Sequence, residues 1–308
     1  MTPALDAARV AAIVRAQFSE LTRSSVTYLG EGCDNWAFEV DGCWVFRFPK
    51  RADVERQLTV ESRMLAVLEP ASPLALPRFC FHGERSAAFP YRFAGYPKLA
   101  GERAIHLDAR SMPLDSWAPA LGAFLSWLHR FPVAVAREAG VEPQDFMTVL
   151  EEVRHDALDD FDLLQSGAPA AAVERWHAFF RTGPPQAVST LPPVLAHMDL
   201  AAEHVLYDVV ARRITGIIDW TEIAIADRAI DVAGLFHWGG PALVREVLAS
   251  YDAGIDAGVL ERARYLAACR GVADVAFGRA TGRPEYVEAG FRAVRLCLDE
   301  TPAAEGLT

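Results

Sequence analysis

Two stretches decide the fold of this 308-residue chain: AHMDLAAEHVLYD at 196–208 and ITGIIDW at 214–220. Asp199 lies five residues before a possible metal ligand, His204, and a second acid, Asp219, follows a β-branched run. Phosphoryl transfer needs a carboxylate to orient the attacking hydroxyl, and oxygen or nitrogen ligands to hold Mg²⁺ against a triphosphate. A lone His or Asp would more simply be a cap or a satisfied core group. The joint spacing argues against that simpler interpretation.

The patterns around these stretches predict two lobes. The first hundred residues predict five strands and one helix, with Asp41-Gly42 as a hairpin turn: Val26–Gly30, Asn35–Val40, Cys43–Phe48, Arg78–Phe81, Tyr91–Tyr96 and the helix Asp53–Glu69. A β-like island at Val194–Asp219 interrupts a mostly helical remainder: Trp117–Phe131, Met147–Leu164, Ala170–Arg181 and several helices after Asp231. We predict an α+β fold with a β-rich N-terminal lobe (1–97), a hinge near Pro97–Gly101, and a mainly helical C-terminal lobe (98–308).

Glu61 interrupts the apolar stripe of its predicted helix. At 100° per residue it falls in the middle of the apolar positions Val54, Leu58, Leu65 and Leu68. A buried carboxylate needs a partner, because an unpaired buried charge is very costly. Arg47 is the best candidate, since it alternates with two phenylalanines along its strand and points to the opposite face. The pair is either purely structural or part of a phosphate-binding site.

Three further features have a structural and a functional interpretation. Gly30 and Gly32 form either a plain hairpin turn or a turn whose N–H groups approach a phosphate. Asp227 resembles a helix N-cap, and Asp231, one turn further on, either holds the catalytic loop or is a surface acid. The acid-rich segment 151–162 is either a solvated helix face or a wall that binds cations.

Charge and composition exclude several classes of protein. The net charge of −11 argues against a nucleic-acid partner. It divides into +1 for residues 1–100 and −12 for the rest, which suits either solubility or an anionic ligand in the first part and a cationic one in the second. No apolar stretch is long enough to span a membrane, and charges interrupt the N-terminal segment, so a cytoplasmic protein is expected. The five scattered cysteines predict neither disulfides nor a zinc site, and each is expected to be buried.

At these residues the chain resembles the aminoglycoside phosphotransferase family, a branch of the protein-kinase-like fold. The resemblance covers nearly the whole chain. It includes GEGCDNWAFEV, VFRFPKRADV, FAGYPKLAGE, LSWLHRFP, HMDLAAEHVLYD and ITGIIDWTEIAIADRAIDVA. GEGCDN is more similar to the 2″-aminoglycoside enzymes, whereas FPKRADV and IDWTE are more similar to the macrolide enzymes. The motifs therefore indicate the reaction better than the acceptor.

The resemblance implies a role for each matching residue. Asp199 would be the catalytic base, and His204 and Asp219 would bind Mg²⁺. Residues at the nucleotide, ATP or GTP, would be Arg47, Glu61, Gly30, Gly32, Tyr96 and Lys98. Charge, and not the resemblance, suggests the acceptor residues, since an acidic wall that includes the 151–162 helix would hold ammonium groups. The expected acceptor residues are Glu203, Glu222, Asp227, Asp231 and Trp238.

Two positions depart from the family pattern. The family usually has Asn where this chain has His204, and His there resembles the 2″-aminoglycoside and macrolide subgroups. A neutral imidazole binds Mg²⁺ less naturally than an oxygen ligand does. Arg47 replaces a lysine, and its fork is larger and can bind bidentately, with Lys50 as the second candidate for that role.

The first hypothesis is therefore a kinase that transfers the γ-phosphoryl of ATP or GTP to a hydroxyl of a cationic aminoglycoside antibiotic. The second is a macrolide kinase, which would need an aromatic pocket, and for this the sequence offers Trp220, Phe236, His237 and Trp238. The third is a kinase for a metabolite such as choline, homoserine or a sugar. The fourth is a pseudokinase that binds nucleotide or a partner without turnover.

Overall fold

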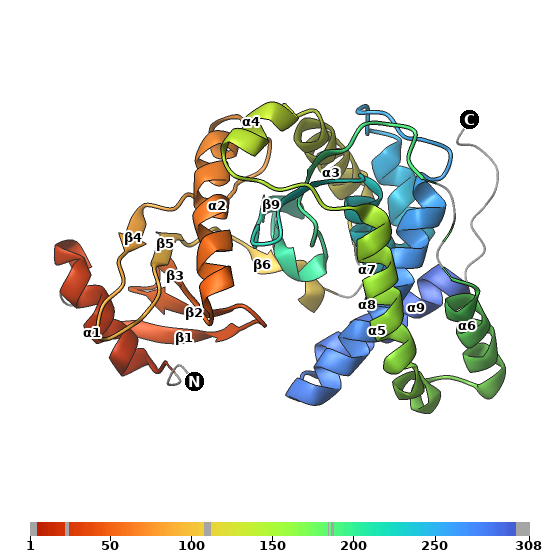
Figure 1. Ribbon diagram of the computed structural model, residues 1–308, viewed down its shortest axis with the longest axis horizontal. Helices are drawn as coiled ribbons and strands as arrows, with labels where there is room; N and C mark the ends of the chain where they lie inside the picture. Colours follow the sequence, from red (N-terminus) through yellow and green to blue (C-terminus); the bar gives the residue numbers. More distant parts are fainter. Residues whose placement is uncertain (1–4, 22–24, 108–111, 184, 186–187, 300–308) are drawn as a thin grey trace.

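The computed structural model describes residues 5–21, 25–107, 112–183, 185 and 188–299. A β-sheet region at the N-terminal side and a helical region at the C-terminal side lie next to each other (Figure 1). The predicted α+β architecture, with a β-rich part followed by a helical part, is confirmed, whereas the boundary at residue 97 stays a prediction.

The N-terminal region is built on a five-stranded antiparallel sheet. Its spatial order is β1 (Val26–Glu31), β2 (Asn35–Val40), β3 (Trp44–Pro49), β5 (Phe93–Pro97) and β4 (Phe81–Gly83). The helices of this region are α1 (Ala7–Gln17) and α2 (Ala52–Leu68). Asp41 and Gly42, which join β2 to β3, both have positive φ (55° and 69°), the conformation that a tight hairpin requires.

Alternation along β3 gives the sheet two different faces. Phe46 and Phe48 are completely buried in an aromatic core, where the Phe48 ring stacks on Phe93 at a centroid distance of 4.5 Å. Arg47, between them, points to the opposite face, toward α2 and the rest of the molecule. The alternation therefore separates the apolar core from the face that carries the site.

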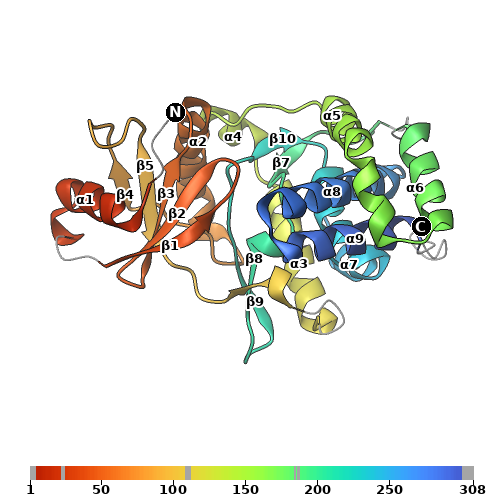
Figure 2. The same cartoon turned by 90° about the horizontal axis from the view of Figure 1, so that it is seen from below.

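The C-terminal region consists of helices around two small sheets. The helices are α3 (Leu114–His129), α4 (Val133–Glu138), α5 (Phe146–Asp159), α6 (Ala170–Thr182), α7 (Ala229–Leu248), α8 (Val259–Thr281) and α9 (Pro284–Leu298). One sheet pairs β7 (Val194–Ala196) with β10 (Ala224–Ala226), and the other is β6 (Glu102–Arg103), β8 (Val205–Asp208) and β9 (Arg213–Ile217). The small sheets lie between the N-terminal sheet and the blue helices α7–α9 (Figure 2).

The structure differs from the sequence prediction in three local features. The strand expected at Arg78–Phe81 is β4 at Phe81–Gly83, and the helix expected to reach Leu164 ends at Asp159, where a 3₁₀ segment, Phe161–Gly167, follows. Cys269 and Cys297 are buried as expected, but the expectation was wrong for three exposed cysteines: Cys33, Cys43 and Cys80. These three lie in or next to turns and short edges of the sheet, where even apolar side chains face solvent. No helix in the described ranges is long and apolar enough to cross a membrane.

Candidate active site

The loop that carries Asp199 connects β7 to β8, and Asp231 of α7 binds its backbone. The two carboxylate oxygens of Asp231 accept hydrogen bonds from the backbone N–H groups of His197 and Met198, each at 3.0 Å. Met198 has a positive φ of 74°, which is uncommon for a residue with a side chain. The buried carboxylate thus stabilises a strained turn that turns the Asp199 side chain, 46% exposed, toward solvent.

Asp231 is itself held by a second pair of residues. His129 Nε2 lies 3.0 Å from Asp231 Oδ2, and His129 Nδ1 lies 2.8 Å from the Tyr251 hydroxyl. Asp231 is completely buried, and its oxygens are occupied. The loop-holding interpretation is therefore confirmed, while the surface-acid interpretation and the expectation that Asp231 contacts an acceptor are wrong.

Arg47 binds two carboxylates, not one. Its Nη1 lies 2.7 Å from Glu61 Oε1, which confirms the predicted pair, and its Nη2 donates to Asp219 Oδ1 at 2.9 Å. The same Nη2 also bonds the Thr221 hydroxyl. Glu61 is completely buried and accepts a further hydrogen bond, 3.1 Å long, from the backbone N–H of Trp220. Arg47 and Glu61 together therefore link β3 and α2 to the segment after β9.

His204 lies between the two acids that flank it. Its Nδ1 lies 2.7 Å from the backbone carbonyl of Asp199, and its Nε2 lies 3.7 Å from Asp219 Oδ2. The carbonyl can only accept, so Nδ1 carries a proton and, in the neutral ring, Nε2 presents its lone pair beside Asp219. Burial alone would lower the pKa of His204, but Asp199 and Asp219 outweigh it and raise the pKa to about 9.

The His204 imidazole and the Asp219 carboxylate fit a magnesium ion whose other ligands are phosphates and waters. Burial would raise the pKa of Asp219, but Arg47 and His204 outweigh it and lower that pKa, so the carboxylate is ionised. Within the described ranges, no three His, Cys, Asp or Glu side chains form a complete metal cage. Mg²⁺ in nucleotide sites is typically bound by one or two side chains plus phosphates and waters, which this pair matches.

The glycine turn, residues 30–34, comprises the last two residues of β1 and the link to β2. Gly30 has a φ of 147°, whereas Gly32 has neither a positive φ nor any neighbour within 4 Å of an added Cβ. The fold itself therefore gives no reason for glycine at position 32, which leaves close approach of a ligand as a reason. Lys50 Nζ lies 2.6 Å from both Glu31 Oε2 and the Gly32 carbonyl. Lys50 thus holds the turn, and Arg47 is the partner of Glu61.

The two predicted nucleotide residues in and after β5 have different surroundings. Tyr96 is buried, and burial raises the pKa of its hydroxyl. The ammonium of Lys98 pairs with Glu39, and its backbone N–H donates to the Cys43 carbonyl at 2.8 Å. The Lys98 side chain therefore binds to the sheet, and its contact with a nucleotide stays a prediction.

The predicted acceptor residues fall into two groups. Glu203 is half-buried beside His204 and Glu222 is exposed. Desolvation and nearby carboxylates, among them Asp199, raise the pKa of each. Both glutamates thus lie within the electrostatic reach of Asp199.

The second group is structural. Asp227 Oδ2 lies 2.8 Å from Arg262 Nε and its Oδ1 accepts from the Ala229 N–H, as expected of an acid at a helix start. Trp238 is 2% exposed and packs on Trp117 in the core. The expectation that Asp227 and Trp238 contact an acceptor is therefore wrong, because an ion pair and the core occupy their side chains.

Two polar groups near the loop were missed by sequence reasoning. His237 Nε2 lies 3.0 Å from Asp274 Oδ2 of α8, and this carboxylate outweighs burial and raises the pKa of His237. Arg270 of α8 donates to the Met198 carbonyl at 2.5 Å. Asp274 and Arg270 come from the middle of a long helix without a motif, so nothing in the local sequence marks them.

The acids of segment 151–162 are mostly exposed, and Glu151 pairs with Arg154, as expected of a solvated face.

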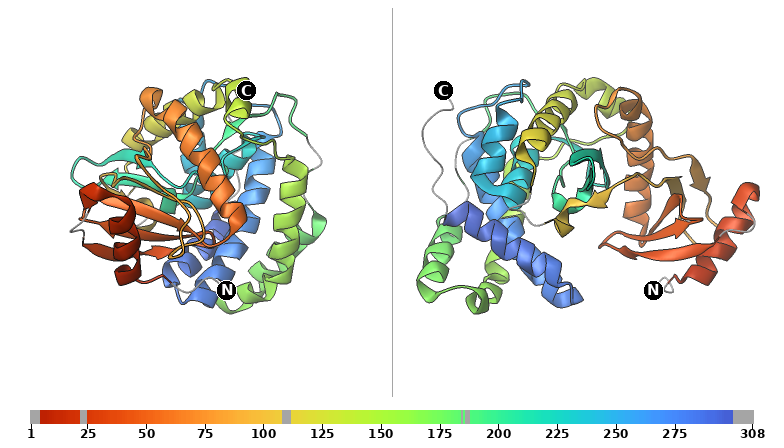
Figure 3. Two further views of the ribbon diagram at one scale, coloured as in Figure 1. Left: turned by 60° about the vertical axis from the view of Figure 1, so that its left-hand side comes forward. Right: turned by 180° about the vertical axis from the view of Figure 1, so that it is seen from behind.

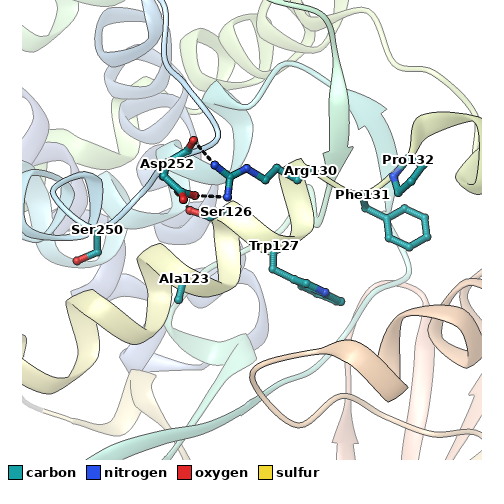
Figure 4. A pocket seen from close by; sticks show the side chains of 8 residues that line it. All are labelled: Ala123, Ser126, Trp127, Arg130, Phe131, Pro132, Ser250 and Asp252. Atoms are coloured by element: carbon teal, nitrogen blue, oxygen red, sulfur yellow. Dashed lines mark hydrogen bonds and ion pairs between the residues drawn. The ribbon is translucent and has the colours of Figure 1, made fainter.

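A cavity of about 560 Å³ lies at the C-terminal end of α3, and none of the predicted site residues is among the residues that line it (Figure 4). Arg130 faces Asp252 there, with 2.6 Å between Nη1 and Oδ1, while the Trp127 ring points away from this pair. Tyr251, next to Asp252, belongs to the network that supports Asp231. The cavity therefore borders the residues that support the Asp199 loop, not the loop itself.

Comparison with known proteins shows which family the chain resembles. Residues 25–266 match the model of the phosphotransferase enzyme family (APH). The chain is 28% identical over 201 residues to the uncharacterized protein YcbJ of Bacillus subtilis strain 168, a match that spans 61% of this chain and 60% of YcbJ.

Solved structures give the same result. The GDP and kanamycin complex of APH(2″)-IIIa is 26% identical, with a TM-score of 0.71 over 94% of this chain and 97% of that one. A type I macrolide 2′-phosphotransferase is 25% identical, with a TM-score of 0.60 over 96% of this chain and 99% of that one. The resemblance to both subgroups is thus confirmed. The family match covers well over half of the residues, and the chain belongs to the phosphotransferase enzyme family, whose members transfer a phosphoryl group to an alcohol.

Proposed function

We propose that this enzyme transfers the γ-phosphoryl group of ATP or GTP to a hydroxyl of an aminoglycoside and thereby inactivates the antibiotic. The observation that carries the proposal is the position of Asp199, His204 and Asp219 around one point, with the Arg47–Glu61 pair behind them. GDP complexes of similar structures support a nucleotide as donor.

Asp199 is the residue that would act on the acceptor. Its partly exposed carboxylate accepts the proton of the attacking hydroxyl and orients that hydroxyl in line with the phosphoryl group. Asp231 keeps this carboxylate in position through the backbone of the loop. Mg²⁺, when bound, would neutralise charge on the phosphates, and His204 and Asp219 would hold it.

The glycine turn and Arg47 would hold the nucleotide from the other side. The space around Gly32 is open, so other N–H groups of the turn can approach phosphate oxygens, while the Gly32 N–H itself donates to the Asn35 carbonyl at 3.1 Å. The guanidinium of Arg47 is buried and oriented by Glu61, which leaves its charge directed at Asp219 and the space in front of it. A phosphate in that space would meet a cation fixed in one orientation.

The environment of the acceptor favours an amine-bearing drug over a macrolide. Glu203 and Glu222 lie near Asp199 and offer carboxylates to ammonium groups. The aromatic residues that would line a macrolide pocket are buried in the core instead: Trp220, Phe236 and Trp238. We therefore place an aminoglycoside first, followed by a macrolide or a small metabolite.

One experiment tests donor and acceptor together. Purified enzyme with Mg²⁺ is incubated with ATP or GTP and with a panel of aminoglycosides, macrolides and small amino alcohols, and products are analysed by mass spectrometry. The expected result is a mass gain of one phosphate on an aminoglycoside, absent with Asp199→Asn. A gain only on macrolides or metabolites would overturn the acceptor. Nucleotide binding without transfer to any acceptor would instead favour a pseudokinase. Resistance of susceptible cells that produce the enzyme checks the role in the cell.

A further inference from the structure

One residue of the helical region reaches the glycine turn. Arg283 directly precedes α9, and its Nη2 donates a hydrogen bond of 3.0 Å to the backbone carbonyl of Glu31, 252 residues earlier in the chain. Glu31 is the last residue of β1 and the second residue of the glycine turn. In Figures 1 and 3 the tip of the blue α8–α9 hairpin lies beside the end of the β1–β2 hairpin.

The arginine is oriented by its own surroundings. Its guanidinium lies over the Phe277 and Tyr286 rings, 5.6 and 6.0 Å from their centroids. Its backbone N–H donates to the Gly278 carbonyl at 2.8 Å, and Gly282, with a φ of 68°, ends α8 in front of it. Cation–π contacts and a closed helix end restrict the side chain, so little freedom is lost when it bonds the turn.

Further polar contacts of the turn come from the two residues that follow β3. Lys50 binds Glu31 and Gly32, and Arg51 binds the Cys33 carbonyl at 3.3 Å and Asp34 at 2.7 Å. These contacts hold the turn to its own sheet, so they do not fix its position relative to the helical region. Arg283 is different, because it ties the turn to the region that carries Asp199.

We propose that Arg283 is a positioning residue. Its hydrogen bond to the Glu31 carbonyl, called the clasp below, fixes the glycine turn relative to the Asp199 loop, so that the turn is correctly placed to bind the triphosphate. The proposal rests on the proposed role of the turn in nucleotide binding. Arg283 acts through the Glu31 backbone and does not touch the reacting atoms. Loss of the clasp therefore loosens the turn and weakens nucleotide binding, while the chemical step on bound substrates changes less.

The test measures the position of the turn without any ligand. Cys33 lies exposed in the turn, and the exposed Cys43 and Cys80 can be replaced by serine, leaving only buried cysteines elsewhere. One spin label on Cys33 and a second on Ala242→Cys, an exposed position of α7, report the distance between the two regions. Arg283→Ala is compared with Arg283→Lys, and with Arg279→Ala, which removes a nearby exposed arginine that binds Ser166 instead of the turn.

We expect a narrow distance distribution in the parent and in Arg279→Ala, and one at least about twice as wide in Arg283→Ala. Binding of a fluorescent ATP or GTP analogue should weaken about fivefold to tenfold in Arg283→Ala, as for a lost hydrogen bond from a charged donor. Arg283→Lys, which keeps a cationic donor, should retain most of the narrow distance distribution and most of the affinity for the nucleotide analogue. Equal melting temperatures would show that α9 is intact.

Two outcomes separate the clasp from the proposed function. If Arg283→Ala gives the same distance distribution as the parent, the clasp is wrong, whatever the enzyme phosphorylates. If the distribution widens but no variant binds a nucleotide, the clasp stands as a contact that fixes the turn, and the nucleotide role of the turn fails.

Discussion

Arg47 and Asp219 are 172 residues apart in the chain, yet Arg47 Nη2 donates to Asp219 Oδ1 at 2.9 Å while its Nη1 holds the buried Glu61. A lysine has one ammonium, a point charge, in place of this fork. The arginine therefore does two things at once: it neutralises the carboxylate of α2 and orients the carboxylate proposed to bind magnesium. The first predictions follow from this double role.

Arg47→Lys should separate the two tasks. The ammonium can remain with the completely buried Glu61, but it cannot also keep the same contact with Asp219. We expect the protein to stay folded and kcat/KM for the nucleotide to fall about tenfold, a loss of about 1.4 kcal/mol of transition-state stabilisation. Steady-state kinetics with the acceptor found by mass spectrometry measure this, and unchanged kinetics would contradict the double role.

Arg47→Met should instead affect folding. It removes the cation beside Glu61, whose burial already raises the pKa of the carboxyl to about 7. Without Arg47 the buried carboxyl takes up a proton or stays an unpaired charge, and the loss of stability is at most about 3–5 kcal/mol. Urea unfolding of Arg47→Met should show that loss. The double variant Arg47→Met/Glu61→Gln should regain a large part of it, because it removes the buried charge too. If the single variant is as stable as the parent, the pair does not stabilise the fold.

Asp199→Asn tests the proposed base. The amide keeps the size of the side chain but cannot accept the proton of the hydroxyl, so kcat should fall about a thousandfold. Nucleotide affinity should change little, because Asp199 is assigned to the acceptor. Isothermal titration with a non-hydrolysable analogue measures that affinity. Full activity of Asp199→Asn would exclude this residue as the base.

His204 should carry a positive charge at neutral pH before metal and nucleotide bind. Burial acts against this, but Asp199 and Asp219 raise its pKa to about 9. Below that pH the proton must leave Nε2 before a metal can bind there, so Mg²⁺ affinity should rise as the pH increases toward 9. Nitrogen-detected NMR of the His204 ring, in the metal-free protein and with Mg²⁺ and an ATP analogue, follows the proton directly. His204→Asn should remove this pH dependence while its Mg²⁺ affinity stays measurable.

Local sequence patterns predicted the parts of the site that depend on periodicity. Alternation in β3 and the apolar stripe of α2 were enough to pair Arg47 with Glu61. The third partner, Asp219, was not predicted as part of that pair, because its approach depends on how the turn after β9 packs on α2. Trp238 was misassigned because α7 is buried on nearly all sides, so an aromatic residue in it cannot be distinguished from a pocket residue by pattern. Tertiary packing, which periodicity does not encode, decided both cases.

The residues that support the Asp199 loop should also affect turnover, though less than Asp199 itself. In Asp231→Asn the amide oxygen can still accept, but the amide nitrogen cannot accept the second N–H of the His197–Met198 pair. An unsatisfied buried N–H costs about 1–3 kcal/mol, and the strained Met198 turn should relax. We expect kcat to fall about tenfold to a hundredfold. Tyr251→Phe, which removes only the hydroxyl bonded to His129, should lose much less.

The contacts of Asp256, which precedes α8, should weaken at acidic pH. Asp256 accepts two hydrogen bonds from the completely buried Arg262, at 2.9 and 2.7 Å, and one from the Gly258 N–H at 2.9 Å. The hydrogen bonds from Arg262 outweigh burial and lower the pKa of Asp256 from 3.8 to about 2.

Because the folded pKa is the lower one, the stability from Asp256 is complete above pH 4 and is lost as the pH falls from 4 to 2. The shift corresponds to about 2 kcal/mol. Urea unfolding between pH 7 and pH 2.5 should therefore show a smaller acid-induced loss in Asp256→Asn, which is already less stable at pH 7. Asp252→Asn is the matched control, since that carboxylate is exposed and pairs with the exposed Arg130. Parallel stability curves for Asp256→Asn and the parent would mean that other carboxylates cause the acid unfolding.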